Sequence, residues 1–74
     1  MRLIAPVPEG FRQDNIEWLV LEDDPRDTAG FYLFFHRSLD APSEHDSWHE
    51  TMEQALFEAE TQYGVKRDNW VPAA

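Results

Sequence analysis

The sequence predicts an α+β fold, in which a three-stranded antiparallel meander is packed by one C-terminal helix in the order β-β-β-α. Two segments rich in large apolar residues, 15–22 and 30–37, flank a polar connection, which is typical of a hairpin. A third apolar pattern, over residues 51–63, has the period of a helix and is followed by Gly64. Together these patterns indicate a single small domain that spans residues 1–74.

The composition of residues 1–12 predicts an irregular arm before the first strand. Pro6 and Pro8 remove backbone donors and Gly10 leaves the backbone free to turn, so regular structure is disfavoured there. A short edge strand over residues 2–4 is the alternative that this composition allows.

Residues 13–50 are expected to hold the strands. Both strands of the hairpin carry large apolar residues on each alternating face: Ile16, Trp18 and Val20 alternate with Leu19 and Leu21, and Phe31, Leu33 and Phe35 alternate with Tyr32 and Phe34. Residues 45–49 are short enough to be a third strand that ends just before the helix.

The helix is marked at both ends. Thr51 is a suitable N-cap, and Gln54 three residues later completes a capping-box pattern. One narrow stripe of the helix is apolar: Met52, Ala55, Leu56, Ala59 and Tyr63. Gly64 is placed to end the helix in a left-handed conformation, and in the tail over residues 64–74 we expect Trp70 to fold back over an open end of the core.

Composition sets the broad class of protein. The chain has 74 residues, of which 42% are apolar and 14% aromatic, which is enough to build one small core. The absence of cysteine excludes disulfide staples and thiolate metal sites and favours a cytoplasmic location. No apolar run approaches the roughly 20 residues of a membrane span, and prolines interrupt the N-terminus too soon for a signal peptide.

Acidic residues outnumber basic ones by 15 to 6, which gives a formal net charge of −9. Nucleic acids and anionic membrane surfaces repel such a chain, because binding to them draws on clustered Lys and Arg. We therefore expect neither a nucleic-acid partner nor a membrane partner. A solvated surface explains the acids, and docking on a basic protein is the functional alternative.

The nearest approach to a metal site is formed by His45 and His49 with their acidic neighbours Glu44, Asp46 and Glu50. A spacing of four residues lets two histidines converge on one ion when they lie on a helix. On a strand, the same residues are about 13 Å apart, which is too far for one ion. We therefore expect no metal at this segment.

Two further constellations are weak. Asp23, Asp24 and Asp27 lack the spaced ligands, the glycine and the closing glutamate of a calcium loop. His36 has no recognisable nucleophile or orienting carboxylate in the sequence. The sequence thus predicts no catalytic residues and no cofactor, and a protein that is not an enzyme.

Apolar residues on both faces of the sheet are the more useful signal, since one helix covers only one face. We expect the uncovered face to form a protein-binding patch from one parity of each strand: Leu19, Leu21, Tyr32 and Phe34. The opposite parity takes their place if the faces are reversed. Phe57, outside the helix stripe, is a further candidate binding residue. The alternative is that residues 1–10 wrap this face and bury it.

Several features follow one another along about residues 15–71: a Phe/Tyr-rich hairpin strand, Trp48-x-x-Thr51, Ala55-x-x-x-Ala59, and Gly64-Val65 followed by Trp70. In this order they resemble a group of very small bacterial proteins of unassigned function. The resemblance implies a three-stranded meander followed by one helix, and it brings no catalytic residues. In size and acidity alone, the chain is also similar to bacterial immunity proteins that neutralise basic toxins.

These observations predict a non-enzymatic protein-binding or self-assembly module, with another protein or a second copy of the chain as its partner. The alternative is an acidic inhibitor, similar to immunity proteins, that docks on a basic partner by electrostatic attraction. Ionic strength separates the two hypotheses, because apolar contacts survive salt whereas electrostatic association slows steeply.

Overall fold

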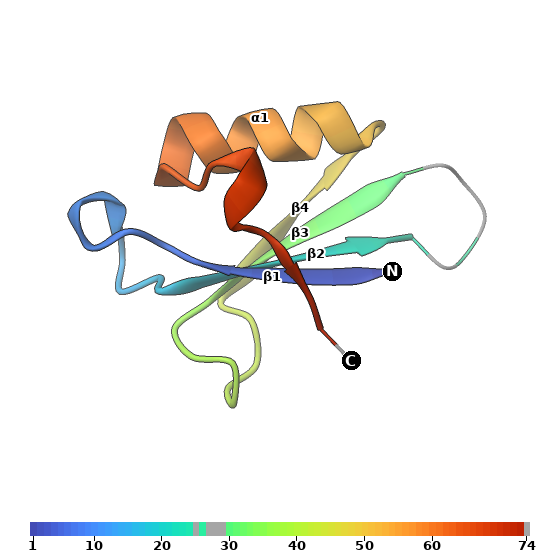
Figure 1. Ribbon diagram of the computed structural model, residues 1–74. Helices are drawn as coiled ribbons and strands as arrows, with labels where there is room; N and C mark the ends of the chain where they lie inside the picture. Colours follow the sequence, from blue (N-terminus) through green and yellow to red (C-terminus); the bar gives the residue numbers. More distant parts are fainter. Residues whose placement is uncertain (25, 27–29, 74) are drawn as a thin grey trace.

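The computed structural model describes residues 1–24, 26 and 30–73 (Figure 1). The elements in chain order are β1 (Arg2–Pro6), β2 (Trp18–Asp23), β3 (Phe31–His36), β4 (His45–His49), α1 (Met52–Tyr63) and β5 (Val71–Pro72). Short 3₁₀ turns at Glu9–Phe11 and Arg67–Asn69 follow β1 and α1. Within the described residues, no helix has both the length and the apolar character needed to cross a membrane.

The strands form one five-stranded antiparallel sheet in the order β4-β3-β2-β1-β5. The α+β class and the packing of a helix against an antiparallel sheet are confirmed. The three-stranded sheet is wrong, because β1 joins the sheet next to β2 and β5 joins it next to β1.

β1 lies within the segment that was expected to be an irregular arm, and it is longer than the short edge strand allowed there. Leu3 of β1 pairs with Leu21 on one side and with Pro72 of β5 on the other. Pro6 is the last residue of β1, where the chain leaves the sheet and its missing N–H disturbs no further pairing. Pro72 is on the edge strand β5, a position that also tolerates proline.

Helix α1 has the bounds that the capping pattern predicts. Thr51 Oγ1 accepts a hydrogen bond from the backbone N–H of Gln54 at 3.1 Å. The Gln54 side chain reaches back to the N–H of Glu50 at 3.0 Å, one residue before the cap itself. At the other end, Gly64 has a left-handed backbone (φ 66°) and its N–H donates to the carbonyl of Glu60. Both ends of the helix are therefore satisfied by local bonds.

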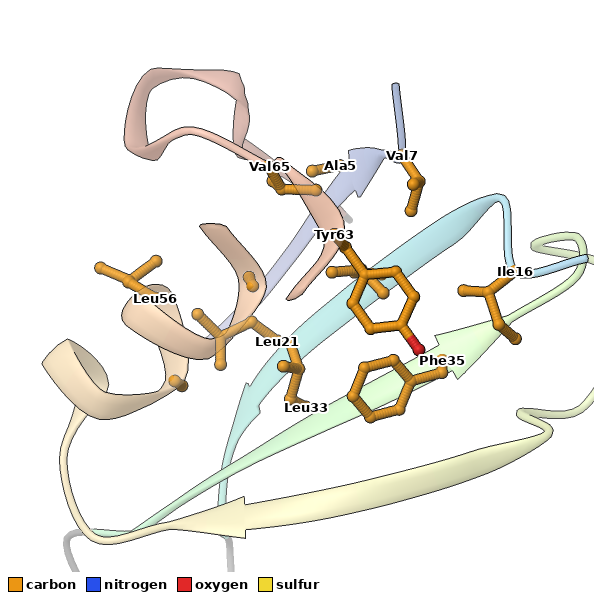
Figure 2. Packing of buried hydrophobic residues seen from close by; sticks show 12 residues of the cluster. Ala5, Val7, Ile16, Leu21, Leu33, Phe35, Leu56, Tyr63 and Val65 are labelled. Atoms are coloured by element: carbon orange, nitrogen blue, oxygen red, sulfur yellow. The ribbon is translucent and has the colours of Figure 1, made fainter. Parts of the chain in front are cut away.

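α1 lies across one face of the sheet and closes the core there (Figures 1 and 2). Ala55 and Ala59 are fully buried, and their small side chains let the helix backbone approach the sheet. The ring of Tyr63 packs on Phe35, with centroids 5.2 Å apart. The other buried members of this core are Ala5, Val7, Ile16, Leu19, Leu21, Leu33, Leu56 and Val65, with Trp70 of the tail packed against them.

The strand register decides which side chains reach this core. Leu19 of β2 lies opposite Phe35 of β3, and Val20 lies opposite Phe34. Because paired residues share a face, odd-numbered side chains of β2 and β3 point toward α1 and even-numbered ones point away. The placement of Leu19 and Leu21 on the uncovered face is therefore wrong: both are fully buried beneath the helix.

Ile16 also departs from the simple alternation that grouped it with Trp18 and Val20. Asp14 and Asn15, just before it, both have positive φ (52° and 64°), and β2 begins only at Trp18. The strand parity therefore does not extend back to Ile16, which is fully buried in the core beneath α1.

Candidate interaction surface on the outer face of the sheet

The face of the sheet turned away from α1, called the outer face below, carries its own apolar residues. In the part of the chain that the structure describes, no helix lies on this side (Figure 1). The strand register places seven apolar side chains on it, called the outer cluster: Ile4, Trp18, Val20, Tyr32, Phe34, Trp48 and Val71. The outer face thus combines side chains from all five strands.

Val20 is the centre of the outer cluster. It is only 1% exposed, yet it does not belong to the core cluster beneath α1. Its register partners are Ile4 on β1 and Phe34 on β3, so larger side chains on both sides cover it. Phe34 also stacks on Tyr32, with ring centroids 5.6 Å apart and planes 22° apart. The outer cluster is therefore a packed layer.

The same layer leaves aromatic and aliphatic surface open to solvent. Trp48 is 45% exposed and Val71 is 50% exposed, while Trp18 and Phe34 are half-buried. Single exposed apolar residues are common on proteins, but a contiguous group on one face is typical of an interaction surface. We therefore treat the outer cluster as the candidate functional site.

Trp48 is held in place by the end of the β2–β3 hairpin. Its indole ring lies so close to Gly30 that a Cβ atom on that residue would overlap the ring. The indole Nε1 donates to Asp24 Oδ2 at 3.3 Å. The backbone N–H of Arg26 donates to the other oxygen of Asp24 at 3.0 Å, and this bond is the main cause that lowers the pKa of Asp24. An ionised Asp24 therefore anchors one edge of the exposed indole.

Charged groups on and beside the outer face nearly balance. Arg2 and Glu22 are paired across β1 and β2, and Arg2 Nε lies 3.5 Å from Glu22 Oε2. Arg26 donates to the hydroxyl of Tyr32 at 2.6 Å and lies near Asp24. Asp46, opposite Phe34 on the edge strand β4, is the remaining acid that the register places on this face within the described residues. The outer face thus differs from the strongly acidic chain as a whole.

The sequence-predicted binding residues fall into three places. Tyr32 and Phe34 lie on the outer face, whereas Leu19 and Leu21 lie in the core. Phe57 is 67% exposed on α1, which covers the opposite side of the sheet. The residues of the outer cluster that sequence reasoning missed are Ile4, Trp18, Val20, Trp48 and Val71. Trp18 and Val20 have the same even parity as Tyr32 and Phe34, and the pairing of β2 with β3 in the structure places all four on one face.

The N-terminal segment does not wrap the outer face. β1 lies within the sheet, and Val7, just after it, is 1% exposed in the core beneath α1. Farther along, the ring of Phe11 lies against Gly64 at the C-terminal end of the helix. This segment therefore closes the helix side of the molecule and leaves the outer cluster accessible.

The three histidines make separate local contacts. The ring of His45 stacks on Phe35, with centroids 4.6 Å apart. His49 Nε2 lies 2.9 Å from Ser47 Oγ, and His36 Nδ1 lies 3.0 Å from the carbonyl oxygen of Ala41. Within residues 1–24, 26 and 30–73, no group of three or more His, Asp or Glu side chains is arranged to hold a metal ion.

The hairpin acids also have individual partners. Asp23 accepts a hydrogen bond from the N-terminal ammonium of Met1 at 2.9 Å, and this bond is the main cause that lowers the pKa of Asp23. Asp24 holds Trp48 and Arg26 as described above. Asp27, the third acid of the sequence pattern, lies outside the described residues.

Comparison of the chain with protein-family models, with curated proteins and with solved structures finds no match. The resemblance to small bacterial β-β-β-α proteins therefore stays a prediction.

Proposed function

We propose that the protein is a non-enzymatic protein-binding module and that the outer face of its sheet is the docking surface. The observation that carries the proposal is the outer cluster itself, a packed layer whose exposed aromatic surface faces away from α1. Aromatic residues at the centre of a patch are the groups that contribute most to protein interfaces.

The hydrogen bonds at the edge of the outer cluster support the same proposal. Asp24 fixes Trp48, and Arg26 binds the Tyr32 hydroxyl, so both aromatic groups are restrained before a partner arrives. Side chains that are already ordered lose less conformational entropy on binding. Protein interfaces commonly combine such an apolar centre with a polar rim.

Site-specific photocrosslinking in cells tests the docking surface. A photoreactive phenylalanine analogue at position 34 probes the outer face, and the same analogue at position 57 is the matched control, because both sites hold phenylalanine. We expect protein adducts from position 34 and few from position 57. Equal labelling from both positions, or no adduct from position 34, contradicts the proposal.

A second candidate is an acidic inhibitor that docks on a basic protein. It is supported by acids that lie away from the outer face, including Glu58 and Glu60 on α1, and by the net charge of −9. This candidate reverses the expected labelling, with adducts from position 57 or 60 that disappear as salt is raised.

A further inference from the structure

The charge pattern and size of the outer face point to one partner. We propose that it is a second copy of this chain, docked outer face to outer face about a two-fold axis parallel to the strands. The inference rests on the proposed docking surface and adds to it the identity of the partner and the geometry of the pair.

Charge selects the face through which two copies can meet. Each chain has a formal net charge of −9, so two copies repel one another over most of their surface. On the outer face, Arg2 offsets Glu22 at 3.5 Å, and Asp46 stands at the β4 edge. Contact through this face therefore brings together surfaces that carry little net charge.

Symmetry then distinguishes two ways of stacking the sheets. A two-fold axis across the strands places each strand over itself, so that Asp46 meets the partner's Asp46 and like charges repel. An axis parallel to the strands exchanges the two edges of the sheet and places β4 of one copy over β5 of the other, next to β1. Only the second arrangement separates the two Asp46 carboxylates.

The parallel axis also creates complementary contacts. Arg2 of one copy and Asp46 of the other then lie about one strand apart across the sheet, roughly 5 Å, and about two residues apart along the strand, roughly 7 Å. An arginine side chain can reach over these offsets. β3 comes to lie over the partner's β1, so Phe34 packs on Ile4. Each pair of contacts occurs twice, because the axis is two-fold.

The area available indicates a weak pair. Four strands of five or six residues are each about 17–20 Å long, and the two-residue β5 adds about 7 Å at one edge. At about 4.8 Å spacing, these strands span a face no larger than about 20 by 17 Å. Two such faces have a combined footprint of about 700 Å², which is below the roughly 1,000 Å² of a stable specific interface. A dimer that forms only at high protein concentration is therefore expected.

Reversing the charge at Asp46 in one variant and at Arg2 in another tests the inference. Association is measured by sedimentation velocity over a concentration series. We expect the mass to rise from 8.7 kDa toward that of a dimer for the wild type, and Asp46→Arg or Arg2→Glu alone to weaken association at least several-fold. A mixture of the two variants places Arg opposite Asp and Arg opposite Glu, and we expect it to associate as tightly as the wild type or more tightly.

Glu60→Arg on α1 is the matched control, because it changes the net charge by the same amount as Asp46→Arg but lies away from the outer face. We expect it to leave association unchanged or slightly stronger. Circular dichroism of each variant confirms that it is folded. The proposed axis is overturned if Glu60→Arg weakens association as much as Asp46→Arg does. It is also overturned if association does not recover in the mixture of Asp46→Arg and Arg2→Glu.

The two proposals fail in different ways. If the wild type stays monomeric at every concentration while position 34 still crosslinks to another protein, the second copy is wrong and the docking surface stands. If position 34 forms no adduct and the wild type stays monomeric, both fail. Recovery of association in the mixed variants supports the second copy and the parallel axis together.

Discussion

The indole ring of Trp48 lies directly on the backbone of Gly30 and leaves no room for a side chain there. The two residues come from the edge strand β4 and from the residue before β3, and they are brought together by the antiparallel pairing of these strands. The contact explains why a glycine stands at this point, and it holds an exposed tryptophan against the sheet.

The first prediction concerns this contact. Gly30→Ala forces the added Cβ into the Trp48 ring, so we expect a loss of stability of about 1–3 kcal/mol in urea unfolding. Gly10→Ala is the control, because a Cβ there meets no atom within 4 Å. Adding Trp48→Ala to Gly30→Ala removes the overlap and should recover part of the loss. Equal midpoints for the two glycine variants would show that Trp48 does not occupy this position.

The second prediction concerns the start of α1. Thr51→Ala removes the acceptor for the N–H of Gln54 and is expected to lower stability by about 1 kcal/mol. Gln62→Ala, an exposed position near the end of the same helix, is expected to be nearly neutral. Paired urea titrations measure both. A neutral Thr51→Ala would contradict the assigned cap.

The third prediction is that the stability of the protein falls at acidic pH because of Glu53. The Arg67 guanidinium donates two hydrogen bonds to this carboxylate, one of them at 2.9 Å, and its bonds and charge lower the pKa of Glu53 from the ordinary 4.5. A folded pKa below the unfolded one adds stability above pH 4.5, and this stability is lost as the pH falls through the lowered pKa. In an NMR titration, Arg67→Ala should return the pKa of Glu53 toward 4.5, whereas Lys66→Ala should leave it lowered.

The fourth prediction is that the stability of the protein falls at alkaline pH because of Tyr63. Burial in the core, followed by the charges of Asp14 and Glu58, raises the pKa of this phenol above 10.0. A raised folded pKa contributes stability that is complete below pH 10 and is lost as the pH rises through the folded pKa. The wild type should therefore lose more stability above pH 10 than Tyr63→Phe does. Tyr32→Phe, on the outer face, is the comparison, and an equal effect of the two substitutions would exclude Tyr63 as the cause.

The fifth prediction concerns metal ions. His45 stacks on Phe35, and the other two histidines bond to Ser47 and to the Ala41 carbonyl, so each of the three rings has its own local contact. Micromolar zinc or EDTA should leave the melting temperature unchanged, because a ligand stabilises a protein only by binding its native state. A shift of several degrees with zinc that is lost in His45→Ala would identify a site at β4.

Part of the candidate site could be predicted from the sequence. Tyr32 and Phe34 are expected on an uncovered face because a single helix covers one side of a sheet, and both lie there. Trp18 and Val20 were assigned to the wrong face because the sequence shows alternation within each strand but not the pairing between strands. A register that opposes Leu19 to Phe35 decides that pairing.

The sequence by itself determined α1, since its caps and its apolar stripe depend on residues a few positions apart: Thr51 with Gln54, and Gly64 with Glu60. Only the tertiary structure decided the five-stranded sheet and the membership of the outer cluster. β1 lies beside prolines that disfavour regular structure and β5 has only two residues, so neither shows a clear strand pattern alone. Both become strands because Leu3 pairs with Leu21 and with Pro72. Local hydrogen bonds can be read from neighbouring residues, whereas contacts between the two ends of a chain exist only once the chain has folded.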